Sequence, residues 1–130
     1  MAERLAGEMR AMELDDTWEI RCATITPDHL HMLVVLGQRL SLSKVIQRLK
    51  AKTALLLRTA ALQWERGFFD RQLRTHDEEL AVFHYVYLNP YRNGICKRDQ
   101  QWPWFYCHDE DWRWMRNRLD RELPPPEWLG

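Results

Sequence analysis

Hydrophobic and polar residues along this chain repeat with two periods, and the longer of them predicts helices. Residues 2–14 place apolar side chains near a period of 3.6, which predicts a short amphipathic helix. Residues 43–62 continue this pattern over a longer stretch, and Ser41 or Ser43 can cap that helix. Its expected apolar stripe consists of Val45, Ile46, Leu49 and Leu56, with Thr53 in register.

Between these two helical segments the pattern is typical of strands. Residues 18–26 are rich in β-branched and aromatic side chains, and residues 29–36 form a second such run. Pro27-Asp28 lies between the runs and is a turn signal, so we expect a β-hairpin. A further short strand, entered through a glycine, is expected over residues 67–73.

The second half of the chain predicts more helix. Thr75 can cap a helix over residues 76–88, and the Asn-Pro pair at 89–90 should stop it, because a residue before proline disfavours helical backbone. The aromatic residues within 102–106 are expected to fold back on the core, and residues 109–121 to form another helix. This mixture predicts an α+β fold, a single antiparallel sheet with helices packed on it.

Composition narrows the class of protein. A chain of 130 residues, 45% hydrophobic and 29% charged, fits one soluble domain, with a core over about residues 18–105 and a tail from about 106. No run approaches the roughly 20 apolar residues that cross a bilayer, and no secretory signal is visible, so we expect a cytoplasmic protein without a membrane partner. Three cysteines without CxxC spacing predict reduced thiols.

The net charge is zero, but the charges are unevenly distributed. The first twenty residues contain six acids and two bases, whereas residues 39–74 contain nine bases and two acids. A basic central segment on a neutral protein is typical of a phosphate-binding face. On charge alone, a solvated helix face without a partner explains the pattern equally well.

The strand pattern places two histidines together. On a β-strand, residues i and i+2 point to the same face, so His29 and His31 should project side by side and could converge on one divalent cation. A second pair lies at the end of the helix over 76–88: Tyr85 and Asn89 are four residues apart and share one helix face. Taken separately, each pair is more often structural than catalytic.

Four motifs that follow one another along the chain favour a catalytic over a structural role for these two pairs. PDHLHMLV, SLSKVIQRLKAKTA, GFFDRQLR and YVYLNPYRNGI, with a following WPW, resemble the IS200-like single-tyrosine transposases of the HUH superfamily, and within them the REP-associated transposases. The resemblance covers roughly residues 18 to 105. It implies a ferredoxin- or RRM-like nuclease fold.

The resemblance also implies roles for particular residues. His29 and His31 match the family's metal-binding histidines, and Asn89 lies where relatives carry an amide that helps to hold the metal. Tyr85 matches the nucleophile, and Tyr87 ranks second for that role. The expected DNA-binding residues are Lys44, Arg48, Lys50, Lys52, Arg71 and Arg74.

The implied activity is cleavage and transfer of single-stranded DNA through a 5′-phosphotyrosine, with Mg²⁺ or Mn²⁺ as cofactor and a REP-like hairpin as partner. A free phenol has a pKa near 10, so attack needs a nearby cation or proton acceptor. The covalent linkage keeps the energy of the broken bond, and the sequence has no Walker-type glycine loop for ATP. A homodimer is a further possibility that the resemblance leaves open.

Three departures from the family pattern keep alternatives open, and one of them is the acidic N-terminal segment, which would repel DNA if it lay beside the active face. The chain begins at about the family's first helix, so an N-terminal truncation is expected, with a sheet edge that a partner chain could cover. The family's Met-Pro-Asn before the first histidine is Thr26-Pro27-Asp28 here. One alternative is therefore an inactive relic that binds nucleic acid, and another is a metal hydrolase that uses His29 and His31 without a covalent step.

Overall fold

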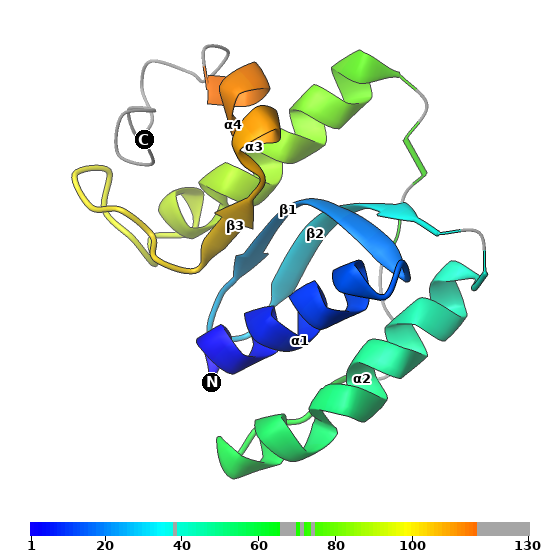
Figure 1. The fold of residues 1–130 in the computed structure, drawn as a ribbon. Coiled ribbons are helices and arrows are strands. Elements are labelled where there is room, and N and C mark those ends of the chain that lie inside the picture. Colours follow the sequence, from blue (N-terminus) through cyan, green and yellow to red (C-terminus); the bar gives the residue numbers. More distant parts are fainter. Residues whose placement is uncertain (38, 66–69, 71, 74, 117–130) are drawn as a thin grey trace. The chain divides into compact units, whose positions relative to one another are not determined.

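The computed structural model describes residues 1–37, 39–65, 70, 72–73 and 75–116. Along these ranges the elements are α1 (Ala2–Leu14), β1 (Trp18–Ile25), β2 (Leu30–Leu36), α2 (Leu42–Thr59), α3 (His76–Arg92), β3 (Phe105–Cys107) and α4 (Asp109–Arg116) (Figure 1). The contacts divide the chain into two compact units, residues 1–19 with 34–72, and residues 20–33 with 73–130. The expectation of a single domain over the whole chain stays a prediction.

In the first unit, α1 packs against α2. The apolar side chains buried in this unit are Leu5, Met9, Met12, Trp18, Val45, Leu49 and Leu57. The stripe on α2 continues in steps of four residues through Thr53 to Leu57, so the expected Leu56 is only partly buried. Thr53 is accommodated because its hydroxyl donates to the Leu49 carbonyl at 2.7 Å and accepts from the Trp64 indole at 2.9 Å.

The sheet has the strand order β2-β1-β3, and β1 pairs with β3 in antiparallel register, with Ala23 opposite Tyr106. The α+β fold with one antiparallel sheet is thus confirmed. β3 was not predicted, because three residues are too few to show an alternating pattern. The buried cluster of the second unit consists of Cys22, Leu33, Phe83, Val86, Tyr87, Leu88, Trp112 and Met115.

The helix α3 does not stop at the Asn-Pro pair, contrary to the prediction, but runs through Pro90 to Arg92. Proline has no N–H, so the carbonyl four residues earlier, that of Val86, loses its helical hydrogen bond. The hydroxyl of Thr24 on β1 donates to this carbonyl at 2.8 Å, and Thr24 is fully buried. A side chain 62 residues away in sequence therefore satisfies the group that Pro90 leaves open.

We expect Thr24→Val to destabilise the protein by about 1–3 kcal/mol, because it leaves the buried Val86 carbonyl without a donor. Chemical denaturation of both proteins measures the difference. Thr24→Ser keeps the hydroxyl and should lose less stability than the valine variant. Equal stability of Thr24→Val and the wild type would show that the hydroxyl does not support the helix at Pro90.

A charged cluster also holds α3 in place within the second unit. Arg21 on β1 contacts Glu79 of α3 at 2.8 Å and Asp111 of α4 at 3.0 Å. The guanidinium carbon lies 5.4 Å from the centre of the Trp114 ring. These contacts fix the helix that carries Tyr85 to the strand beside it.

Three further expectations have different outcomes. The helix expected over residues 109–121 is present as α4, and its last residues lie outside the described part. The strand expected over 67–73 falls mostly on residues that are not described, and residues 70, 72 and 73 show no regular structure. The cysteines form no disulfide in the described structure. Within the described ranges, no helix has the length and apolar character needed to cross a membrane.

Candidate active site

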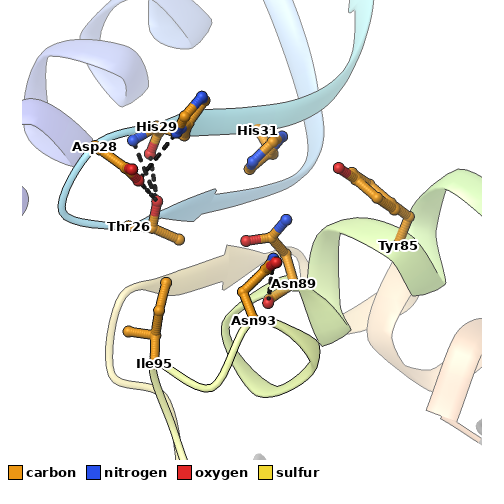
Figure 2. Close-up of a pocket in the computed structure, with 8 residues that line it drawn as sticks. All are labelled: Thr26, Asp28, His29, His31, Tyr85, Asn89, Asn93 and Ile95. Carbon is orange, nitrogen blue, oxygen red and sulfur yellow. Dashed lines mark hydrogen bonds and ion pairs between the residues drawn. The ribbon is translucent and has the colours of Figure 1, made fainter.

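Eight residues of the second unit surround a cavity of about 400 Å³ (Figure 2). They come from the turn between β1 and β2, from β2, from α3 and from the chain just after α3. They are Thr26, Asp28, His29, His31, Tyr85, Asn89, Asn93 and Ile95. The structure thus brings together the two histidines, the tyrosine and the asparagine that the sequence singled out.

The two imidazoles lie parallel on one side of the cavity. Their ring centres are 5.6 Å apart and the ring planes differ by 8°, as expected for positions i and i+2 of a strand. His29 precedes the first residue of β2, whereas His31 lies within the strand. Burial lowers the pKa of His31, and the neighbouring His29 lowers it further. His31 is therefore neutral at physiological pH and has a lone pair for a cation.

The turn before β2 orients the first histidine. The Nδ1 atom of His29 lies 2.9 Å from a carboxylate oxygen of Asp28, and this hydrogen bond lowers the pKa of Asp28. With Nδ1 occupied in this way, Nε2 is the ring nitrogen available to a metal. Thr26 closes the turn, since its N–H donates to the His29 carbonyl at 2.9 Å and its hydroxyl accepts from the His29 N–H at 3.2 Å.

The tyrosine faces the histidines from α3. Its ring centre lies 5.6 Å from that of His31 in an edge-on arrangement, and Figure 2 shows the hydroxyl of Tyr85 pointing toward His31. Tyr85 is 51% exposed, so a substrate can reach it. Asn89, one helical turn later, is 5% exposed and directs its amide into the same space.

Tyr87 has a different environment. It is 2% exposed, it packs on Phe105 and Trp112, and its hydroxyl has no hydrogen-bond partner among the described residues. Burial raises the pKa of Tyr87 well above the ordinary value for a phenol. A phenol that is buried and hard to ionise is a poor nucleophile, so the structure argues against the second-ranked role of Tyr87.

The side chains that could bind a metal in this cavity do not fill all the coordination positions of a divalent cation. No group of three or more His, Cys, Asp or Glu side chains that could hold a metal occurs within the described ranges. Two imidazoles and the amide oxygen of Asn89 could bind one divalent cation and leave positions open for water or phosphate oxygens. Open positions are what a catalytic metal site requires.

The comparison with protein families agrees with this arrangement. The family model described as "Transposase IS200 like" matches residues 1–89. The chain belongs to this family. The matched segment contains the histidine pair and Tyr85 and ends at Asn89, so most of the cavity of this IS200-like transposase lies on family residues. No curated protein matches the chain, and no solved structure matches it.

Two cavity residues lie beyond the family match. Asn93 caps the C-terminal end of α3, four residues after Asn89, and Ile95 follows it two residues later. Sequence reasoning missed both, because it ended the helix at the Asn-Pro pair. The spacing of four residues from Tyr85 through Asn89 to Asn93 would have been the signal for Asn93.

The expected DNA-binding residues that are described lie on α2, in the first unit. Two of them have protein partners: Arg48 contacts the Asp15 carboxylate at 2.8 Å, and the Lys50 ammonium donates to the Glu65 carbonyl at 2.7 Å. Lys44 and Lys52 are exposed. Arg71 and Arg74 lie outside the described residues. One acid of the N-terminal segment, Asp15, therefore neutralises one base of α2 in this transposase.

Proposed function

We propose that this chain cleaves and rejoins single-stranded DNA through a covalent bond to Tyr85. The observation that supports this most directly is the accessible phenol of Tyr85 edge-on to His31, in a cavity that also contains His29 and Asn89. A nucleophile, imidazole ligands for a cation and room for a phosphate are what the reaction requires. Membership of a transposase family favours this chemistry over other uses of the same groups.

The proposed reaction is a transesterification in which atoms and charge balance. The Tyr85 oxygen bonds to phosphorus, the bond from phosphorus to the 3′ oxygen breaks, and the tyrosine proton leaves to solvent while the 3′ oxygen gains one. The products are a 5′-phosphotyrosine and a strand with a free 3′-hydroxyl. Attack by a 3′-hydroxyl on the same phosphorus reverses the step and joins strands without ATP.

The residues around the phenol have separate tasks in this proposal. His29, His31 and the Asn89 amide would hold Mg²⁺ or Mn²⁺, which when bound supplies Lewis-acid stabilisation to the phosphate. Asp28 keeps the His29 ring in one orientation through Nδ1. Fixed positions of this kind lower the cost of bringing the phosphorus to the phenol.

We further propose that the substrate is a single strand beside a REP-like hairpin. A single strand can bend into a cavity of about 400 Å³, whereas a duplex holds its phosphates on a rigid surface. Lys44 and Lys52 on α2 are exposed and available to the backbone phosphates.

The test uses hairpin oligonucleotides taken from palindromes in the DNA that flanks the gene, with a fluorophore on either end. With Mn²⁺ or Mg²⁺, the 3′-labelled strand should give a protein–DNA band that survives detergent, and the 5′-labelled strand a shorter free product. A covalent band with the 5′ label instead would contradict the proposed polarity. Product that also forms in excess EDTA would contradict the role of the cation.

A second candidate is a DNA-binding module that has lost the reaction. It is favoured by the side chains present, since the described residues contain no group of three or more His, Cys, Asp or Glu that could hold a metal ion. Retention of the labelled hairpin on a native gel, with no cleavage of either strand, would support this candidate. A hydrolase without a covalent step would instead cleave both labelled strands and give no detergent-resistant band.

A further inference from the structure

The cavity extends past the residues that the proposed reaction uses. Asn93 and Ile95 line it beside Asn89, and neither has a task in cleavage or in holding the cation. Both lie beyond the segment that matches the family model. A cavity of about 400 Å³ is within the size range that binds a small organic group, and exceeds the space that one ion needs.

The end of α3 holds these two residues in fixed positions. Gly94 has φ of +70°, its N–H donates to the Tyr91 carbonyl at 3.2 Å, and the Ile95 N–H donates to the Pro90 carbonyl at 2.9 Å. This pair of bonds is the Schellman arrangement, in which a left-handed residue turns the chain directly after a helix. Ile95 is consequently directed back beside the helix end and remains 38% exposed at the cavity.

The orientation of the Asn93 amide follows from its one partner. An Asn93 side-chain atom lies 2.9 Å from the Asn89 carbonyl oxygen, and because that oxygen only accepts, the atom must be Nδ2. The oxygen Oδ1 is then an acceptor, and no described residue donates to it. Nδ2 retains a second hydrogen, so the exposed amide offers one acceptor and one donor beside an apolar side chain.

We propose that Asn93 and Ile95 bind the nucleobase next to the scissile phosphate and select adenine or cytosine, the bases whose Watson–Crick edge carries an amino group beside an unprotonated ring nitrogen. The amino group would donate to Oδ1, the adjacent ring nitrogen would accept from Nδ2, and Ile95 would cover the face of the base. This inference rests on the proposed function, because it assumes that the phosphate binds beside Tyr85.

The test measures binding, so that it does not depend on cleavage. The length of the 5′-labelled product of the wild type first defines the cleavage position. Tyr85→Phe protein is then titrated with hairpin strands in which the nucleotide on either side of this position is each of the four bases in turn. At one of these positions, adenine or cytosine should bind at least about ten-fold more tightly than guanine or thymine. Adding Asn93→Ala should remove this preference, and the cooperative thermal transition of this variant should show that it remains folded despite the lost hydrogen bond to the Asn89 carbonyl.

Two further variants separate recognition from general loss of affinity. Arg92→Ala removes the neighbouring exposed charge, which does not line the cavity, and should weaken all four substrates equally. Asn93→Ser keeps a short donor for the Asn89 carbonyl but cannot reach a base, so it should lose the preference as the alanine variant does. A base preference that is the same in Asn93→Ala and its parent would overturn the inference.

The two proposals can fail separately. If the wild type forms no covalent band, the cleavage position is replaced by a scan of each unpaired nucleotide beside the hairpin, and a preference lost in Asn93→Ala would still support base recognition. If the wild type cleaves but every base binds equally, base recognition alone is overturned.

Discussion

Replacement of Tyr85 with phenylalanine is expected to abolish the covalent protein–DNA product. The variant keeps the ring that faces His31 and loses only the oxygen that would attack phosphorus. Removal of a nucleophile typically lowers a rate by several orders of magnitude, so we expect a loss of at least about 10³-fold. The measurement is the detergent-resistant band formed with the 3′-labelled hairpin over time.

Tyr87→Phe is the matched control, two residues away on the same helix. The hydroxyl of Tyr87 is buried without a partner among the described residues, so its removal should leave the melting temperature equal to or above that of the wild type. Cleavage by this variant should equal that of the wild type. If Tyr87→Phe rather than Tyr85→Phe abolished the covalent band, the assignment of the nucleophile would be wrong.

Replacement of His31 with alanine is expected to have the second-largest effect. His31 is the half-buried member of the histidine pair, and it is adjacent to both His29 and Tyr85. Loss of a group that only supports a metal ligand typically lowers metal affinity by about 10–100-fold. Loss of a ligand itself should therefore weaken Mn²⁺ binding by more than about 100-fold. Manganese paramagnetic resonance measures free Mn²⁺ directly and does not require DNA.

His108→Ala is the control for this experiment. His108 is exposed directly before α4 and does not line the cavity, so this variant should bind Mn²⁺ as the wild type does. The His31→Ala protein should also retain binding of the hairpin on a native gel while cleavage falls in parallel with metal affinity. Unchanged Mn²⁺ affinity in His31→Ala would remove the histidine pair from the proposed metal site.

Local sequence patterns predicted the elements that depend on local physics. The amphipathic period over residues 2–14 correctly predicted the bounds of α1. The two strand patterns on either side of Pro27-Asp28 correctly predicted β1 and β2. The length of α3 could not be predicted in this way. It depends on Thr24 of strand β1, whose hydroxyl donates to the Val86 carbonyl that Pro90 leaves without a helical hydrogen bond.

The error at Pro90 also explains what was missed in the site. A helix that ends before the proline leaves Asn93 and Ile95 in an undefined loop, whereas a helix that continues places Asn93 on the face of Tyr85 and Asn89. The histidine pair was predictable, because i and i+2 of a strand share a face whatever the tertiary fold. That this pair lies against Tyr85 came from the resemblance to the family and not from spacing.

The most direct test of the account is to identify the amino acid that carries the DNA. Wild-type protein is incubated with the hairpin and Mn²⁺, the covalent product is digested with nuclease and trypsin, and the modified peptide is sequenced by mass spectrometry. We predict a nucleotide attached through its 5′ phosphate to Tyr85. Attachment to any other residue, or a covalent product that forms equally in His31→Ala, would contradict it.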